Sequence, residues 1–444
     1  MPTNLCPRRR KGGYGRPAGT VRTDHLPLGR PPLRRGAEGL PRGAGHRGPA
    51  PRRRGARPHR LSTGSRTPRR RTRRGESTGV LRGRPSRLRG VSGRRARGHR
   101  GDVVSAVPDT DRPLVATVLA GGIGSRLYPA SRSHRPKQLL SLAGEDTLLE
   151  RTVDRVAFAD AVVVVTRPAF VDAVRETVPE ASVLVEPAGK DTGPALAYAT
   201  HRIEERFDDP VVLALPSDHY VDGDFEPTAR RGARVAAETD ALVTFGVEPD
   251  RPETGYGYIE PGSDHGDYAE VAAFHEKPDA ETAESYVARG YYWNAGIFTW
   301  TPRAFREAAE GTPLGPLLDA LDAGDADGGF DAVDPVSVDY AVLERATDVV
   351  TVPLDVAWDD LGSWDALQRL LPADEDGTVV AGDAEVVSVD AENNVVASDD
   401  VHVSLVGVEG LAVVAYDDRV LVVPTEEAQR VRDLVATLKE RGEF

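Results

Sequence analysis

The chain has 444 residues and a formal net charge of −12, and its single cysteine, Cys6, excludes a disulfide framework and a cysteine-based metal site. No stretch approaches the roughly 18 uninterrupted apolar residues of a membrane helix, and the arginines of the N-terminus have no apolar core beside them such as a signal peptide needs. These features predict a cytoplasmic protein that contacts no membrane and is long enough for about three folding units.

Residues 1–100 carry 30 lysines and arginines against three acidic residues, a net charge of +27. Dense like charge with Gly and Pro and few apolar residues predicts a disordered Arg-rich segment over residues 1–110. A nucleic-acid-binding arm is one interpretation, but Tyr14 is the only aromatic residue before Asp102, so no base-stacking surface accompanies the charge. We favour a second interpretation, in which residues 1–110 are a wrongly assigned N-terminal extension. This composition is what a GC-rich upstream region gives when it is translated.

Residues 101–444 have the opposite character, with 27 basic and 66 acidic residues and a net charge of −39. Their lysines number four, Lys137, Lys190, Lys277 and Lys439. Abundant Asp and Glu with little Lys is typical of proteins from a salt-rich cytoplasm, where the Debye length falls to about 3 Å at molar salt. The composition therefore predicts a halophilic protein that unfolds at low salt, and it disfavours nucleic acid as a partner of this part of the chain.

From Pro113 the chain alternates short β-branched runs with amphipathic helical stretches. We expect strands over residues 114–119, 161–166, 182–186, 211–215 and 241–246, and helices over 147–156 and 193–207. Because continuous apolar strands indicate that both faces of a sheet are buried, the pattern predicts an α/β domain over 113–371 with a mostly parallel, doubly wound, Rossmann-like sheet. Ligands of such folds bind beyond the carboxyl ends of the strands.

After Leu371 the pattern changes to short β-like pieces separated by Gly, Asp and Asn, over residues 378–380, 385–389, 394–397, 401–408, 411–416 and 419–423. This predicts a second, small β-rich domain over 372–444. It ends in an expected helix over 426–440, capped by Thr425, whose apolar stripe of Val431, Leu434, Val435 and Leu438 we expect to pack against the core.

A glycine-rich segment follows the first expected strand, with the sequence AGGIGSR over residues 120–126. Glycines after a strand let backbone N–H groups approach a phosphate with no side chain in between. The segment is not a Walker loop, and GGxG alone is a weak signal. Arg126 and Lys137 strengthen it, because they place two cations near the loop, as a polyphosphate requires.

Asp218 stands at the end of another expected strand, in the sequence LPSDH over residues 215–219. Its carboxylate is a ligand that suits Mg²⁺, although a turn or a helix cap is the alternative for an isolated strand-end aspartate. Asp359 and Asp360 offer a second acid pair within an aromatic, Gly-containing segment. His219 is compatible with a structural role and receives no other assignment.

Eight ordered motifs over Leu114 to the C-terminus resemble the mannose-1-phosphate guanylyltransferase family of the sugar nucleotidyltransferase superfamily. They are LAGGIGSRLYPASRSHRPKQLL (119–140), EPAGKDTGPA (186–195), LPSDH (215–219), FGVEPDRPETGYGYIE (245–260), FHEKP (274–278), WNAGIF (293–298), SVDYAVLE (337–344) and WDDLGSWDAL (358–367). The resemblance implies transfer of GMP from GTP to α-D-mannose 1-phosphate, which gives GDP-mannose and pyrophosphate with Mg²⁺ as the cofactor.

The resemblance also implies the site residues, with Arg126, Lys137, Asp218, Lys277 and Asp360 in catalysis. Asp218 and Asp360 are expected to bind the metal, Asp360 rather than Asp359 because the superfamily's acid stands two residues before the glycine. The residues expected to bind the nucleotide are Leu119, Ala120, Gly121, Gly122, Gly124, Ser125, Arg126, Lys137, Glu186, Lys190 and Thr192. Those expected to bind the sugar phosphate are Gly255, Tyr256, Gly257, Tyr258, Glu276, Lys277 and Asn294.

Three features of the sequence bear on specificity, assembly and the alternatives to this function. Lys190 is followed by Asp191 where the family usually has Asn, which bears on recognition of the base. The β-rich domain resembles the β-helical domain of monofunctional family members, and it could support a homodimer or stability alone. The alternatives to the main prediction are another sugar-1-phosphate nucleotidyltransferase, using glucose 1-phosphate with dTTP or UTP, and a nucleic-acid-binding protein that acts through the Arg-rich N-terminus.

Overall fold

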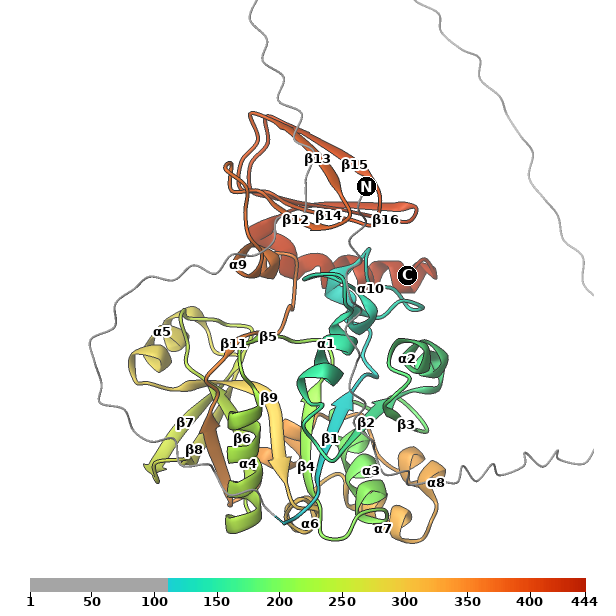
Figure 1. Cartoon of the computed structure of the whole chain (residues 1–444), viewed down its shortest axis with the longest axis vertical. Helices are drawn as coiled ribbons and strands as arrows, with labels where there is room; N and C mark the ends of the chain where they lie inside the picture. Colours follow the sequence, from blue (N-terminus) through green and yellow to red (C-terminus); the bar gives the residue numbers. More distant parts are fainter. Residues whose placement is uncertain (1–110) are drawn as a thin grey trace, which may run out of the picture. The chain divides into compact units, whose positions relative to one another are not determined.

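The structure, a computed structural model, describes residues 111–444, so the predictions for residues 1–110 lie outside the described residues. Its largest element is a nine-stranded sheet in the order β3-β2-β1-β4-β9-β6-β10-β8-β7 (Figure 1). The strands are β1 (Leu114–Leu119), β2 (Ala161–Thr166), β3 (Ser182–Val185), β4 (Val211–Pro216), β6 (Leu242–Val247), β7 (Gly257–Asp264), β8 (Ala269–Glu276), β9 (Tyr292–Trp300) and β10 (Val349–Pro353). Of these, β8 and β9 run opposite to the other strands, which confirms a mostly parallel sheet.

Helices cover both faces of this sheet, as the doubly wound prediction requires. They are α1 (Leu148–Arg155), α2 (Val171–Thr177), α3 (Thr192–Glu204), α4 (Glu226–Thr239), α5 (Ala280–Ala288), α6 (Pro302–Ala309), α7 (Gly315–Asp322) and α8 (Ala326–Asp331). The short helix α9 (Ala366–Leu370) packs instead against the β-rich part. Leu114, Ala116 and Val118 of β1 pack into a hydrophobic core with α1, α2 and α4. Val115 points to the other face, into a core with α3, α6, α7 and α8. This alternation follows from the period of two in a strand.

The helix predicted over 147–156 begins at a capping box. The Thr147 hydroxyl accepts a hydrogen bond from the Glu150 backbone N–H at 3.2 Å, and the Glu150 carboxylate accepts one from the Thr147 N–H at 2.7 Å. Two N–H groups that the helix itself leaves unpaired are thereby satisfied. This cap fixes the point at which the chain returns to the sheet after the glycine-rich segment.

The β-rich part winds as a β-helix-like coil, as predicted. Its strands are β12 (Val379–Gly382), β13 (Glu385–Val389), β14 (Val395–Ser398), β15 (His402–Val406), β16 (Leu411–Tyr416) and β17 (Arg419–Pro424). β12, β14 and β16 pair in parallel and β17 closes their sheet antiparallel, while β13 and β15 form a second parallel pair. Paired residues, such as Val379 with Val395 and Glu385 with His402, are 16 or 17 positions apart, so the coil does not follow a hexapeptide repeat.

The terminal helix begins later than predicted. Residues Thr425–Arg430 form a 3-10 segment, η5, and the α-helix α10 spans Val431–Arg441. Thr425 does not cap this helix, because its hydroxyl donates a hydrogen bond to the Gly410 carbonyl at 3.1 Å. Of the predicted stripe, Leu434 is exposed, and the other three residues are buried in the core.

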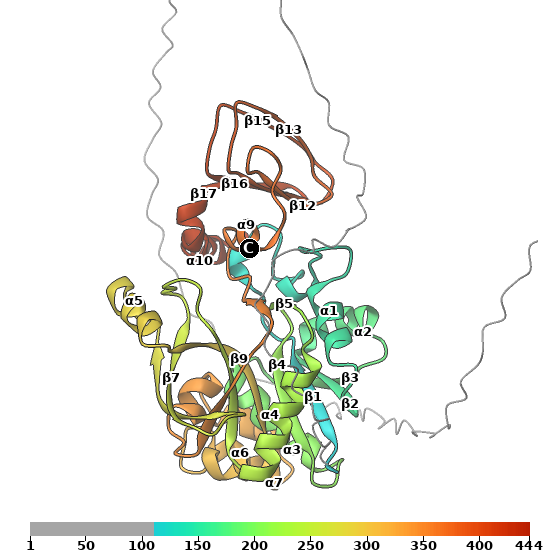
Figure 2. The same cartoon turned by 60° about the vertical axis from the view of Figure 1, so that its left-hand side comes forward.

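The β-rich part shares a hydrophobic core with the segment that follows β1. Leu127, Tyr128 and Leu140 of that segment, Trp364 before α9, and residues of β12, β14, β16 and α10 belong to one buried cluster. Figures 1 and 2 both show α10, in red, beside the turquoise segment after β1, which contains the 3-10 turn η1 (Ser125–Leu127). The two parts are therefore expected to unfold together.

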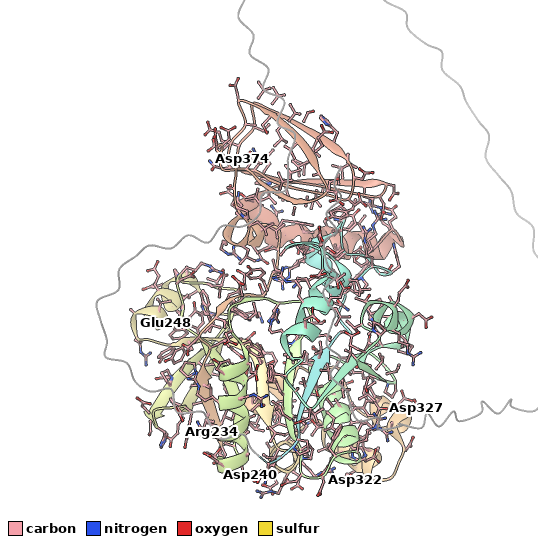
Figure 3. The ribbon with its side chains drawn as sticks, viewed as in Figure 1. Arg234, Asp240, Glu248, Asp322, Asp327 and Asp374 are labelled. Carbon is pink, nitrogen blue, oxygen red and sulfur yellow. The ribbon has the colours of Figure 1, made fainter. Side chains whose placement is uncertain are left out.

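Arginines form ion pairs with many of the acidic residues of the surface. Arg234 of α4 pairs with Glu238 and Asp267, and Arg306 of α6 pairs with Asp322, and the labelled Arg234 and Asp322 lie on the outside of the α/β part (Figure 3). Exposed pairs of this kind contribute little stability each, and salt screens them. Among residues 111–444, no helix is both long enough and apolar enough to cross a membrane.

Candidate active site

Two neighbouring cavities lie at the carboxyl ends of the parallel strands. The first, of about 410 Å³, is lined by residues at the ends of β1, β2 and β4 and at the start of α3. The second, of about 600 Å³, is lined by residues from β7, β8 and β9 and by the segment around Trp358. Asp191, His219, Gly296 and Asp339 line both cavities, so the cavities meet at these four residues.

The glycine-rich loop after β1 opens onto the first cavity. A Cβ at Gly122 would have no atom within 4 Å, so the loop leaves free space there. At Gly121 a Cβ would stand 2.8 Å from Glu186 Oε1, and at Gly124, whose φ is +67°, it would stand 2.3 Å from the Cβ of Lys137. Gly124 is thus required by the fold, Gly121 lies against the end of the Glu186 side chain, and Gly122 leaves room for a group in the cavity.

Glu186 forms a buried wall of the first cavity. It is 4% exposed, and its Oε2 has no hydrogen-bond partner among the described residues. Burial raises the pKa of Glu186 to about 7, since the opposing effect of Arg167 is smaller and Asp191 adds to the increase. A carboxylate in this state is able to accept a hydrogen bond from a ligand at neutral pH.

A short strand pairing brings the two predicted metal-binding acids together. β5 (Tyr220–Asp222) begins directly after His219, and β11 (Ala357–Asp359) ends directly before Asp360. The two strands pair antiparallel with Tyr220 opposite Asp359. Asp218 and Asp360 therefore lie at the same end of this pairing, at the carboxyl end of β4.

Lys137 joins these two acids. Its Nζ donates hydrogen bonds to Asp218 Oδ2 at 3.0 Å and to the Asp360 backbone carbonyl at 2.6 Å. Burial alone would raise the pKa of Asp218, but the Lys137 ammonium, through its charge and its hydrogen bond, holds that pKa below its ordinary value. Asp218 is therefore a carboxylate at neutral pH, with its other oxygen available to a ligand.

Asp359 and Asp360 have different surroundings. Asp359 is 2% exposed and pairs with Arg369, at 3.0 Å from Nη2 and 3.2 Å from Nε, while its other oxygen accepts the Leu361 N–H. Asp360 lines the second cavity, and its Oδ1 accepts hydrogen bonds from the Tyr256 hydroxyl at 3.0 Å and from the Gly362 N–H at 2.8 Å. Asp359 is therefore bound to its arginine, and Asp360 is the member of the pair that faces a cavity.

Aromatic residues fix the wall of the second cavity. Tyr256 stands edge-on to Trp293 and to Trp358, with both pairs of ring centroids 5.2 Å apart. Burial, with the nearby carboxylate of Asp360, raises the pKa of Tyr256 above its ordinary value. The hydroxyl thus stays protonated and donates to Asp360.

The floor of the second cavity carries an oriented amide. Asn294 on β9 accepts hydrogen bonds at Oδ1 from the Thr244 hydroxyl at 3.2 Å and the Gly296 N–H at 3.0 Å, and its Nδ2 donates to Asp339 Oδ1 at 2.9 Å. Burial, together with Glu276, raises the pKa of Asp339 despite the hydrogen bond from Asn294. Asp339 begins a π-helical turn, η4 (Asp339–Leu343), a conformation that often occurs at functional sites.

Glu276 and Lys277 lie at the end of β8 and line the same cavity. Their side chains form an ion pair, and the Lys277 side chain is 60% exposed. Gly255 and Gly257 complete this wall. The second cavity thus contains acidic, amide and hydroxyl groups, with one flexible ammonium group from Lys277.

Several predicted site residues lie outside both cavities. Tyr258 is fully buried, and its hydroxyl donates to the Glu253 carbonyl at 2.9 Å. Lys190 donates to the Val333 carbonyl at 2.8 Å. The others outside the cavity linings are Ala120, Gly124, Ser125, Arg126 and Lys137. In contrast, Leu119, Gly121, Gly122, Glu186, Thr192 and Asp218 line the first cavity.

Arg126 contacts the β-rich part of the chain. Its Nη1 donates a hydrogen bond to Gln429 Oε1 of η5 at 3.0 Å, and Gln429 Nε2 donates to Ser363 Oγ at 2.8 Å. The arginine of the glycine-rich loop is thereby held by a residue some 300 positions away in the chain. No local sequence pattern could indicate this contact.

The departure at Asp191 has a structural explanation. Asp191 adopts φ 70° and ψ −177°, and its Oδ1 accepts the Thr192 N–H at 2.8 Å at the start of α3. Both Asn and Asp carry this oxygen, and both tolerate positive φ better than most residues. The substitution therefore preserves the helix cap and adds a charge where the two cavities meet.

Sequence reasoning missed Asp339 and Gly296 and left His219 without a role. Asp339 and Gly296 stand inside the quoted segments SVDYAVLE and WNAGIF, and His219 inside LPSDH. Their place in these three segments was the sequence signal that could have identified them as site residues. Which side chain of each segment faces a cavity depends on η4, on the positive φ of Gly296 and on the β5–β11 pairing.

Comparisons with known proteins find relatives of both parts of the chain. Residues 115–377 match the family model for nucleotidyl transferases, and residues 384–438 match the mannose-phosphate isomerase/GMP-like β-helix domain. The chain is 39% identical to the mannose-1-phosphate guanylyltransferases of Klebsiella pneumoniae and Escherichia coli K12, over 74% of its length and 75% and 74% of theirs. A solved structure described as mannose-1-phosphate geranyltransferase from Thermus thermophilus is 34% identical with a TM-score of 0.69, over 74% of this chain and 99% of that one.

Proposed function

Because the chain belongs to the mannose-1-phosphate guanylyltransferase family, we propose that it transfers GMP from GTP to mannose 1-phosphate, which gives GDP-mannose and pyrophosphate. Membership of this family makes the chain a nucleotidyltransferase enzyme. The observation that carries the proposal is the meeting of two unlike cavities beside Asp218 and Asp360. A nucleotide fits the cavity with the glycine-rich loop, and a sugar phosphate fits the polar one.

The reaction needs positioning more than proton transfer. A phosphate oxygen of the sugar phosphate attacks the α-phosphorus of GTP, and the bond from that phosphorus to the bridging oxygen of pyrophosphate breaks. A phosphate monoester has a second pKa near 6, so the attacking group is already largely dianionic at neutral pH. No general base is required, and the site must align the two substrates and neutralise their negative charge.

Gly122 leaves space for the phosphates of the nucleotide, and Lys137 supplies positive charge between the two acids. The residues present fit a magnesium ion. Asp218 and Asp360 are two carboxylates brought together at one end of the β5–β11 pairing, and Mg²⁺ typically takes one or two carboxylates plus phosphate oxygens. When bound there, Mg²⁺ would neutralise charge on the phosphates. Lys137 keeps the Asp218 carboxylate ionised for this purpose.

Glu186 accounts for a preference for guanine. Guanine presents two neighbouring N–H donor groups on its pairing edge, and a carboxylate accepts from both. Uracil and thymine present one N–H between two carbonyl oxygens, which a carboxylate repels. The buried Glu186, whose Oε2 has no partner in the described residues, is an acceptor suited to guanine.

Binding of GTP is expected to weaken as the pH falls through 7. Since the pKa of Glu186 is raised to about 7, the carboxylate is present above that pH and protonates below it. A protonated carboxyl loses an acceptor, so the KM for GTP should rise about tenfold between about pH 8 and about pH 6. Steady-state kinetics at saturating mannose 1-phosphate measure this change.

Glu186→Gln is the matched control for the pH profile. It should raise the KM for GTP at least about tenfold at pH 8 and remove most of its pH dependence. Both substrates titrate equally in assays of the two proteins, so the difference between the profiles reports Glu186. An unchanged profile in the variant would contradict the assignment.

Lys277→Ala is expected to raise the KM for mannose 1-phosphate about tenfold or more and to change the KM for GTP little. Lys277 lines the second cavity and not the first, and its largely exposed side chain, paired with Glu276, can exchange that carboxylate for a phosphate. Lys439→Ala on α10 is the control, because Lys439 lies over the Phe444 ring, away from both cavities. A larger effect on GTP than on the sugar phosphate would reverse the assignment of the two cavities.

Product analysis tests the proposed activity itself. The full chain, incubated with GTP, mannose 1-phosphate and Mg²⁺, should form GDP-mannose and pyrophosphate in equal amounts, as measured by anion-exchange chromatography and mass spectrometry. Asp218→Asn serves as the inactive control. Release of inorganic phosphate or GDP without GDP-mannose would contradict transfer to the sugar phosphate.

A further inference from the structure

His219 stands where the two cavities meet and has no part in the function proposed so far. It follows Asp218 at the end of β4, and it lines both the nucleotide cavity and the sugar-phosphate cavity. Two substrates that react with each other must bring their reacting groups to such a place. The orientation and the protonation of this ring therefore bear directly on the chemistry.

The hydrogen bond from Trp358 fixes the orientation and the protonation of the His219 ring. The indole N–H of Trp358 lies 3.2 Å from His219 Nδ1, and the two rings stand edge to face with an interplanar angle of 83°. An indole nitrogen only donates, so Nδ1 accepts and carries no proton. The ring is then the neutral tautomer with its proton on Nε2. Trp358 is itself held edge-on against Tyr256, so the imidazole has one fixed orientation.

The Nε2–H group has no hydrogen-bond partner within the described residues. Among residues 111–444, the hydrogen bond from Trp358 is the one that the His219 ring makes. Gly296 stands at positive φ beside the ring, and a Cβ at that position would lie 3.7 Å from His219 Cε1, the carbon between the two ring nitrogens, which is an ordinary contact distance. Gly296 and His219 both line the two cavities, so this edge of the ring lies where the cavities meet.

We propose that the Nε2–H of His219 donates a hydrogen bond to a non-bridging oxygen of the phosphoryl group that is transferred. The inference rests on the proposed function, because this phosphoryl group is the part of GTP that must lie between the two cavities. The proton stays on Nε2 throughout, and the bond strengthens as negative charge develops on the phosphoryl oxygens. A fixed donor of this kind stabilises the transition state more than the ground state.

Two substitutions of His219 distinguish the role of Nε2 from the role of Nδ1. His219→Gln places an amide N–H near the position of Nε2 and loses the acceptor for Trp358. His219→Asn places its oxygen near Nδ1, retains that acceptor and loses the donor. If His219 acts through Nε2, the Asn variant should lower kcat about 100-fold with little change in either KM, and the Gln variant should stay within about tenfold of the wild type.

Thermal melting of both variants controls for folding. A larger loss of kcat in His219→Gln than in His219→Asn would assign His219 a purely structural role through Trp358. Equal losses in the two variants would also contradict the inference. An inactive wild-type chain would contradict the proposed function itself, whereas an active wild type with an equally active Asn variant would overturn this inference alone.

Phosphorothioate nucleotides give a readout that a structural role would not change. The two diastereomers of GTPαS place sulfur, a weaker acceptor than oxygen, at one or the other non-bridging position. The hydrogen bond reaches one of these positions, so His219→Asn should change the ratio of the rates with the two diastereomers by about tenfold. A variant that slows both diastereomers equally would overturn the proposed contact.

Discussion

Replacing Asp218 by asparagine is expected to lower kcat by about 1,000-fold or more while the secondary structure stays unchanged. The substitution removes a carboxylate that Lys137 holds ionised at the carboxyl end of β4. Asparagine supplies one neutral oxygen in its place, a poor ligand for a magnesium ion, and it leaves the phosphates of the reacting groups less well neutralised. The same side-chain shape keeps the packing around Lys137.

The measurement is pyrophosphate release at saturating substrates and increasing Mg²⁺, with circular dichroism to report the fold. Asp222→Asn is the matched control, because Asp222 is an exposed residue of β5 four positions away and should retain wild-type turnover. Activity of Asp218→Asn within tenfold of the wild type would refute the role given to Asp218. Equal losses in the two variants would indicate a general effect of charge.

Replacing Trp364 by alanine is expected to destabilise the protein by about 3–5 kcal/mol. Trp364 is fully buried in the core that the β-rich part shares with Leu127 and Tyr128, and its Nε1 donates to the Tyr128 carbonyl at 3.0 Å. The variant leaves a large cavity and an unpaired buried carbonyl. The loss of stability should affect both the α/β part and the β-rich part, because residues of both parts form the walls of that cavity.

Urea unfolding followed by circular dichroism in molar KCl measures this effect. The wild type and Trp364→Ala should each unfold in one transition, with the variant at a lower urea concentration, and Trp364→Phe should lie between them because it retains a ring in the core. A loss below about 1 kcal/mol would contradict the burial. Two separate transitions, of which one alone moves, would contradict the shared core.

Five strands of the sheet, β1 to β4 and β6, were predicted from local pattern. β1 and β2 have the predicted bounds, and the runs of Val and Ala in them are buried on both faces. The other four, β7 to β10, were not predicted. For the antiparallel β9, the neighbours β4 and β6 are chosen by tertiary pairing rather than by anything in residues 292–300. The late start of the terminal helix has a similar cause, since Thr425 is bonded to Gly410 of the preceding coil.

The chemical groups of the site were named from motifs, but their grouping depends on the fold. The pattern of residues predicted a loop for phosphates and a carboxylate at the end of β4. It could not show that β5 and β11 pair, which places Asp218 near Asp360 and His219 against Trp358. It also could not show that Asp339 orients Asn294, or that Gln429 holds Arg126, because each contact joins residues far apart in the chain.

The most direct test of the central claim is pyrophosphate release by the full chain in molar KCl with Mg²⁺, crossing GTP, dTTP and UTP with mannose 1-phosphate and glucose 1-phosphate. The account predicts rapid release with GTP and mannose 1-phosphate and release at least about 100-fold slower with dTTP or UTP, because Glu186 favours the donor edge of guanine. Release with glucose 1-phosphate should also be slower, as membership of the family implies. Equal or faster release with dTTP or UTP, or with glucose 1-phosphate, would contradict it.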